Sequence, residues 1–188
     1  AAGETMGAWG LTEPGSGSDA GGMLTTAVRD GDDYILNGAK NFITHGNVGS
    51  IAVIMAVTSE GKRGISAFAI DKSMPGFQAT KKENKVGMRC SDTASLVFDN
   101  VRVPQRNLIG QEGMGFMFQM LQFQEERLWG AASSLRGLDR LTDLTIDYTR
   151  QRHAFGKSIL DNQVVHFRLA ELRTEVAARA QALKAKGV

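Results

Sequence analysis

The 188-residue sequence contains a single cysteine, Cys90, and no long hydrophobic run. One cysteine excludes internal disulfide bonds and a cysteine-based zinc site, which favours a reducing compartment. No apolar segment reaches the roughly 18 residues of a membrane-spanning helix, and the first ten residues lack the charged-then-apolar order of a signal peptide. These absences predict a cytoplasmic protein without a membrane span.

The sequence also lacks any block of like charge, because its 22 basic and 20 acidic residues are scattered and leave a formal net charge of +2. No basic stripe of the kind that holds nucleic acid is present, so we expect no nucleic-acid partner. His45, His153 and His166 show no mutual metal-ligand spacing, and we expect no metal site. Cys90 is expected to serve packing rather than to act as a nucleophile.

The hydrophobic pattern changes once along the chain. From Met23 to about Pro104, short apolar runs alternate with turn-rich pieces, which predicts six or seven strands, with a hairpin turn at residues 29–33. After Gly115, and again from about Gln163, apolar residues recur every three or four positions, which predicts two long helices. The expected fold class is therefore α+β: a small β-barrel or sandwich domain over residues 1–108, then two antiparallel helices over residues 109–188.

Two helices cannot bury both of their faces alone. Either they pack on the β-domain, or they are half of a four-helix bundle whose remainder lies outside this chain.

A polar segment, "LTEPGSGSD" at residues 11–19, precedes the predicted strands. Glycine leaves the backbone N–H groups accessible, and three hydroxyl groups add donors, namely Thr12, Ser16 and Ser18. Such a segment suits an anion or the polar edge of a cofactor, although the same residues also form ordinary turns. The glycine spacing fits a dinucleotide-binding fingerprint, but that motif requires a following helix, and the predicted hairpin excludes it.

Five segments make the chain resemble the acyl-CoA dehydrogenase family over nearly its whole length. They are "GLTEPGSGSDAGG", "YILNGAKNFITHG", "KVGMRCSDTASLVFDNVRVP", "IGQEGMGF" and "RQRHAFGKSILDNQ". The resemblance implies a middle β-domain that binds flavin adenine dinucleotide (FAD) and C-terminal helices that build a homotetramer. It also implies a fragment that lacks a first helical domain and the end of the second.

By this resemblance, Thr12 lies near the reactive edge of the flavin ring, Ser18 touches both cofactor and substrate, and Phe42 and Thr44 lie against the isoalloxazine. Family members often carry tryptophan at the Phe42 position, and the alternative for Phe42 is a core residue of a strand. The full set of expected cofactor-binding residues is Trp9, Leu11, Thr12, Gly17, Ser18, Phe42, Ile43, Thr44, Arg152, Phe155, Asn162 and Gln163.

The second half of that set follows the first helix. The resemblance implies that Arg152 reaches the flavin pyrophosphate of a neighbouring subunit, where a guanidinium fork suits the group. Without the resemblance, Arg152 is a solvated helix-end charge, a role that Arg150 would fill as well. Asn162 and Gln163 approach the cofactor in relatives, but each could equally start the second helix.

Glu126 lies opposite the apolar stripe of the first helix, on a side that is unusually poor in charge. The residues around it are Gln119, Gln122, Gly130, Ser133 and Gly137. Each mid-helix glycine costs about 1 kcal/mol relative to alanine, so this side predicts a close neighbour, either another helix or the acyl chain of a substrate.

In isovaleryl-CoA and long-chain acyl-CoA dehydrogenases the catalytic base immediately precedes the residue that matches Arg127. The resemblance therefore implies that Glu126 is the base, whereas most relatives place the base in a segment that would lie beyond Val188. Ser18, Gln124 and Arg127 match positions that contact the acyl-CoA substrate.

The expected function is FAD-dependent α,β-dehydrogenation of an acyl-CoA thioester, with α-proton abstraction and transfer of the β-hydride to flavin N5. Electron-transferring flavoprotein is the expected electron acceptor. Two alternatives stay open: an acyl-CoA oxidase-like flavoprotein that reacts with oxygen, and a non-catalytic fragment that does not hold flavin by itself.

Overall fold

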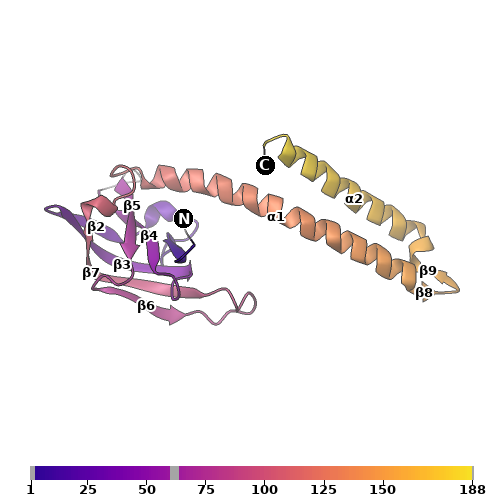
Figure 1. Cartoon of the computed structure of the whole chain (residues 1–188), viewed down its shortest axis with the longest axis horizontal. Coiled ribbons are helices and arrows are strands. Elements are labelled where there is room, and N and C mark those ends of the chain that lie inside the picture. The colour runs from indigo at the N-terminus through magenta and orange to yellow at the C-terminus, as the bar shows by residue number, and fades with distance from the viewer. Residues whose placement is uncertain (1–2, 60–63, 188) are drawn as a thin grey trace. The chain divides into compact units, whose positions relative to one another are not determined.

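The computed structural model describes residues 3–59 and 64–187, which form two compact units. We call the part up to Met120 the β-unit and the part from Leu121 the helical unit. The expected order of strands followed by two helices is confirmed (Figure 1). The strands and helices are β1 (Gly7–Gly10), β2 (Thr26–Asp30), β3 (Asp33–Thr44), β4 (Ile51–Val57), β5 (Ile65–Asp71), β6 (Phe77–Lys82), β7 (Thr93–Pro104), α1 (Gly115–Gln151), β8 (His153–Ala154), β9 (Lys157–Ser158) and α2 (Gln163–Lys184).

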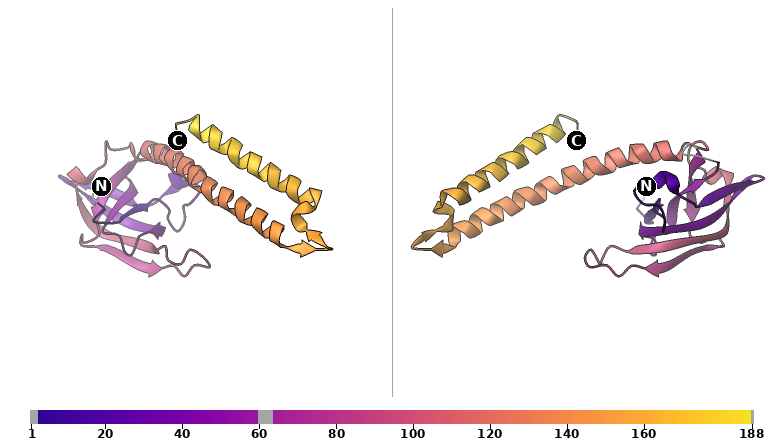
Figure 2. Two further views of the ribbon diagram at one scale, coloured as in Figure 1. Left: turned by 45° about the vertical axis from the view of Figure 1, so that its right-hand side comes forward. Right: turned by 180° about the vertical axis from the view of Figure 1, so that it is seen from behind.

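The β-unit is built on one sheet, which within the described residues has seven strands in the order β1-β4-β2-β3-β7-β6, with β5 paired to β4. The sheet curls so that its inner face encloses the core (Figures 1 and 2). The predicted hairpin joins β2 to β3, with Asp30 opposite Asp33 and Gly31 at a φ of 62°. Glycine reaches that left-handed conformation without a Cβ clash, which is why it occupies a two-residue turn.

The core follows from the two-residue period of the strands. In β3, Tyr34 and Leu36 point inward and are at most 1% exposed, and the ring of Tyr34 packs edge-on against Phe68 of β5 at 5.0 Å. Residues of β4, β5 and β7 complete the same cluster, which therefore joins distant parts of the sheet. Burial of this apolar surface is the main stabilising contribution to the β-unit.

The first turns of α1 lie against β5. A Cβ on Gly115 would stand 2.9 Å from the carbonyl oxygen of Ile65, so only glycine permits this close approach. Within the described residues, no helix is long and apolar enough to cross a membrane.

In the helical unit, α1 and α2 run antiparallel and side by side (Figures 1 and 2). Arg173 of α2 makes ion pairs with Asp139 and Asp143 of α1, the first at 2.6 Å. Leu169 is the buried hydrophobic residue of α2. Both helices expose large apolar side chains, as expected. They include Leu138, Leu141, Leu144 and Tyr148 on α1 and Val164 and Phe167 on α2.

Candidate functional site

The polar loop, residues 11–19, is a tight turn. The backbone N–H of Glu13 donates to the Ser16 carbonyl at 2.8 Å, and the N–H of Ser16 donates back at 3.2 Å, with Pro14 and Gly15 exposed at the tip. The hydroxyl of buried Ser16 donates to the Asp19 carbonyl at 2.6 Å. The expectation that three hydroxyl groups of this loop are available as donors is therefore wrong for Ser16, because the turn itself uses that hydroxyl.

The other two hydroxyl groups of the polar loop are open to a ligand. Thr12 is half-buried and Ser18 is exposed, and in the described part of the chain neither hydroxyl has a hydrogen-bond partner. Gly17 is exposed between Ser16 and Ser18, and Leu11 packs against a small apolar cluster at the edge of the core. The loop therefore offers polar groups to solvent while its ends are fixed to the β-unit.

The end of β3 contains an irregularity that turns an aromatic ring outward. The register of β3 against β7 shifts between Lys40 and Ile43, so both of these side chains are buried although they are three residues apart. Phe42 consequently points outward, 63% exposed, with a φ of 59°. Left-handed backbone at a non-glycine residue is uncommon and is concentrated at functional sites, as are β-bulges. Phe42 is thus not a core residue of the strand.

The polar loop and the end of β3 lie side by side. The backbone N–H of Asn41 donates to the carbonyl of Thr12 at 2.8 Å, which places Thr12 next to the bulge that carries Phe42. Thr44 is exposed at the end of the strand. Ile43 belongs to the core, so it offers a ligand its backbone rather than its side chain.

Trp9, on β1, lies two residues before the polar loop. Its indole is held by Gln119, which was not among the site residues expected from the sequence. Its indole Nε1–H donates to Oε1 of Gln119 at 2.8 Å, and Gln119 is fully buried. Trp9 also packs on the apolar cluster that contains Met23 and Met55.

Sequence reasoning also missed the pair that lies beneath the polar loop. The ammonium of Lys40 is 2.7 Å from a carboxylate oxygen of Glu13, with side chains 0% and 5% exposed. Burial raises the pKa of Glu13, whereas hydrogen bonds from Lys40, Thr25 and Leu24 lower it. The hydrogen bonds together outweigh burial, so the pKa of Glu13 lies below its ordinary value. Burial lowers the pKa of Lys40, and the Glu13 carboxylate opposes that shift. The burial of Lys40 could have been predicted from the two-residue period of β3, which places position 40 on the inner face of the strand.

Glu126 lies on an exposed part of α1 within the helical unit. One of its carboxylate oxygens, Oε1, accepts a hydrogen bond of 3.2 Å from Nε2 of Gln122. A Cβ added to Gly130 or Gly137 would meet nothing within 4 Å, so the described residues of the helical unit do not provide the close neighbour that the small residues predict.

The two expected coenzyme A contacts flank Glu126 on the same helix. The guanidinium of Arg127 lies 5.2 Å from the ring centre of Phe123, a cation–π contact one turn away. Gln124 and Glu125 are exposed.

Arg152 and Phe155 lie at the short hairpin that joins the two helices. Arg152 is exposed, and its guanidinium has no partner among the residues that the structure describes. Phe155 and Gly156 form the two-residue turn between β8 and β9, with φ values of 52° and 76°. Two positive φ values are characteristic of a type I′ turn, which is strained for phenylalanine, and Phe155 is fully exposed. Like Phe42, it is an aromatic ring held outward by an unfavourable backbone.

The start of α2 follows the hairpin. Asn162 is the residue before the helix, and its side chain donates to the Ile159 carbonyl at 3.0 Å instead of capping the helix. Gln163 is the first helical residue and is exposed. The interpretation of both as helix-start residues is confirmed, and Gln163 still presents its amide to solvent.

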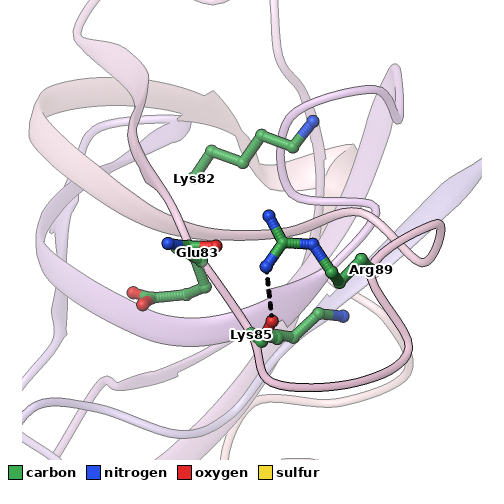
Figure 3. A pocket seen from close by; sticks show the side chains of 5 residues that line it. Lys82, Glu83, Lys85 and Arg89 are labelled. Carbon is green, nitrogen blue, oxygen red and sulfur yellow. Dashed lines mark hydrogen bonds between the residues drawn. The ribbon is translucent and has the colours of Figure 1, made fainter.

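A separate pocket of about 260 Å³ follows β6 and contains none of the expected site residues (Figure 3). Lys85 donates to the Ser91 carbonyl at 2.7 Å, and Arg89 donates to the Lys85 carbonyl at 3.0 Å, the bond drawn in Figure 3. These charges therefore shape their own loop. Cys90 in the same loop is exposed, so the expectation that it serves packing is wrong.

Comparison with known proteins identifies both halves of the chain. Residues 8–101 match the acyl-CoA dehydrogenase middle domain, and residues 113–185 match the acyl-CoA dehydrogenase C-terminal domain. An acyl-CoA dehydrogenase of Bacillus subtilis is 43% identical over 95% of this chain and 48% of its own length. The mitochondrial long-chain specific acyl-CoA dehydrogenase of Rattus norvegicus is 42% identical over 93% of this chain and 42% of its own.

Solved structures agree with these sequence matches. Butyryl-CoA dehydrogenase from Megasphaera elsdenii superposes with a TM-score of 0.89 at 38% identity, covering 96% of this chain and 48% of that one. The chain thus spans about half the length of the relatives that it matches.

Proposed function

Because the chain belongs to the acyl-CoA dehydrogenase family, we propose that it is part of an enzyme that dehydrogenates an acyl-CoA thioester between its α and β carbons with the help of FAD. The chain would supply the middle β-domain and the first helices of the C-terminal domain. The match to both domains, together with coverage of about half of each relative, supports this assignment.

The observation that carries the proposal is the contact between the polar loop and the bulge of β3. The hydrogen bond from Asn41 to the Thr12 carbonyl brings Thr12, whose hydroxyl has no partner among the described residues, next to the residue that carries the outward-facing ring of Phe42. Hydroxyl donors suit the polar edge of a flavin, and an exposed aromatic ring suits its flat face. These residues fit the cofactor, and strained outward-facing Phe42 has no core function that would otherwise explain it.

When bound, FAD would supply the acceptor for the hydride of the substrate β-carbon. Thr12, Ser18 and Thr44 would hold the cofactor through their hydroxyl groups, and Phe42 would cover the ring. Arg152, and Phe155 beside it, would bind a cofactor held by a neighbouring subunit, since a guanidinium fork suits a pyrophosphate.

Glu126 would take the α-proton of the substrate on a carboxylate oxygen. The amide of Gln122 donates to Oε1 and so helps to orient the carboxylate, which keeps lone pairs on both oxygens for the proton. Arg127, with its guanidinium stacked on Phe123, would bind the coenzyme A moiety together with Gln124. Removing the acidic α-proton by a positioned carboxylate is ordinary general base catalysis.

We further propose that the full-length protein is a homotetramer and that electron-transferring flavoprotein accepts its electrons. The apolar side chains exposed on both helices support subunit association.

The test uses the purified full-length protein. Its absorption spectrum reports bound flavin, and anaerobic addition of acyl-CoA thioesters of graded length should bleach that flavin in one turnover. A protein that binds no flavin, or whose flavin no acyl-CoA reduces, contradicts the proposal. Stopped-flow reoxidation by oxygen separates the two flavoprotein classes, because a dehydrogenase reacts slowly and an oxidase reacts fast.

A further inference from the structure

The buried pair of Lys40 and Glu13 connects three separate segments of the β-unit. Lys40 donates to the Leu11 carbonyl at 3.1 Å as well as to Glu13, and its ammonium lies 3.9 Å from the sulfur of Met23. The Glu13 carboxylate also accepts from the backbone N–H groups of Leu24 and Thr25 at 2.6 and 3.0 Å. One ion pair thus ties the start of the polar loop and residues 23–25 to β3.

Stability alone does not explain a charge pair at this position. Removing two charges from water is expensive, and well-packed hydrophobic residues of similar volume are often as stabilising as a buried ion pair or more so. Contacts between hydrophobic side chains are not directional, so they do not fix which atoms meet. The Lys40 ammonium has two oxygen neighbours and one sulfur neighbour, and this set fixes the positions of the segments that carry them.

The segments that the pair joins are those that carry the proposed flavin contacts. Glu13 directly follows Thr12, and Lys40 is separated from Phe42 only by Asn41, whose N–H is itself bonded to Thr12. Any slip of the polar loop against β3 would change the spacing between the Thr12 hydroxyl and the bulge. The buried pair opposes such a slip from the core side of the same junction.

We propose that Lys40 is a positioning residue for the flavin: through Glu13 and the Leu11 carbonyl it holds the polar loop in register with the β3 bulge. Lys40 does not touch the cofactor. This role rests on the proposed function, since it assigns a cause to the alignment of residues that would bind FAD.

The test replaces the pair by a hydrophobic one, Lys40→Met with Glu13→Leu, in the full-length protein. The double variant avoids an unpaired buried charge, but it removes the acceptor of the Leu24 and Thr25 N–H groups, so it should unfold at a lower urea concentration than the original. Its FAD should bind roughly tenfold more weakly, the effect of misaligning one or two hydrogen bonds. The absorption envelope and reduction potential of the remaining flavin should also change. A merely structural role would leave both of these unchanged.

Lys85→Met is the matched control. Lys85 is half-buried where Lys40 is fully buried, but like Lys40 it donates to a backbone carbonyl and a side chain, in a loop that contains none of the expected site residues. It should leave the flavin spectrum and affinity unchanged.

Glu13→Gln and a flavin-free measurement keep the proposal testable if the double variant unfolds. Glu13→Gln keeps the shape of the pair and removes its charge, so it should change the flavin spectrum in the same direction. In flavin-free protein, the amide of Thr25 should exchange its hydrogen faster in the variants than in the original. The proposal would be overturned if the folded variants kept the flavin spectrum, the FAD affinity and the Thr25 amide exchange rate of the original protein. Failure of the proposed function is distinct, because there the unmodified protein itself would hold no flavin.

Discussion

The indole of Trp9 donates its hydrogen bond to Oε1 of Gln119, which joins β1 to the first turns of α1. Gln119 is fully buried, and among the described residues its Nε2 has no partner. An unpaired buried donor costs about 1–3 kcal/mol, so the NH₂ group of Gln119 destabilises the fold. The favourable contribution of this amide is its oxygen, which accepts the hydrogen bond from Trp9. Because Trp9 lies two residues before the polar loop, this bond fixes the strand that enters the proposed flavin site.

Gln119→Leu should therefore destabilise the chain by about 1–2 kcal/mol, because it leaves the partly buried indole N–H without an acceptor. Adding Trp9→Phe to Gln119→Leu should recover part of the lost unfolding free energy, since the double variant has neither the indole N–H nor the amide. Urea unfolding followed by circular dichroism measures both. Trp129→Phe is the control, at a side chain that is 73% exposed, and should change the free energy of unfolding by less than about 0.5 kcal/mol. Equal stability of Gln119→Leu and the original chain would contradict the argument.

The strand pattern was predictable up to the bulge and not beyond it. Tyr34 and Leu36 alternate as a half-buried strand should, and a strict two-residue period would bury Phe42 with them. The bulge breaks that period, and one of its contacts is the hydrogen bond from Asn41 to Thr12, a group far away in the sequence. Local sequence carries no signal for such a contact.

The candidate site was predictable where residues act alone and not where they act in pairs. The hydroxyl groups of Thr12 and Ser18, expected as donors, have no partner among the described residues, whereas Ser16 bonds within its own turn. Lys40 stands at an inward position of β3, but a lysine is rarely buried unless it is paired. Its partner Glu13 lies 27 residues earlier, so only the folded chain reveals the pair.

The buried pair should also make stability depend on pH. The pKa of Glu13 in the folded chain lies below its ordinary value of 4.5, so its charge stabilises the fold fully above that value and less as the pH falls through the folded pKa. The difference in unfolding free energy between the original chain and Glu13→Gln should therefore be constant near neutrality and shrink in acid. Urea unfolding over a pH series measures it. Glu171→Gln, which removes an exposed ion pair, should show a small difference at every pH, and a pH-independent difference for Glu13→Gln would contradict the argument.

Arg152→Ala should weaken FAD binding in the full-length protein by roughly tenfold or more, because a charge-assisted bond to a pyrophosphate is worth more than a neutral one. Flavin retained after gel filtration and equilibrium FAD binding both measure the effect. Arg150→Ala is the matched control, since that arginine pairs with Asp147 of its own helix at 3.3 Å and should matter little. Equal losses in the two variants would mean that helix-end charge, and not a cofactor contact, explains Arg152.

The helical unit should make the chain associate. Leu141, Leu144 and Tyr148 form a stripe on α1 and are between 53% and 62% exposed. Apolar surface of this kind promotes association, so light scattering should find species larger than a monomer. Leu144→Lys should shift the distribution towards the monomer, whereas Gln78→Lys adds the same charge at an exposed position of the β-unit and should not. A monodisperse monomer of the original chain would contradict the prediction.

Glu126→Gln should abolish most catalysis in the full-length enzyme while preserving its binding of FAD and acyl-CoA. The amide keeps the shape of the carboxylate and its contact with Gln122, but it cannot accept a proton from the substrate. Anaerobic single-turnover reduction by saturating acyl-CoA should therefore slow by roughly 10²–10⁴-fold, the usual effect of removing a general base. Glu125→Gln is the control, because it removes the same charge about 100° further round the helix and should change the rate little. Near-normal reduction in Glu126→Gln would instead place the base in a segment beyond Val188 and leave Glu126 as part of the wall of the pocket.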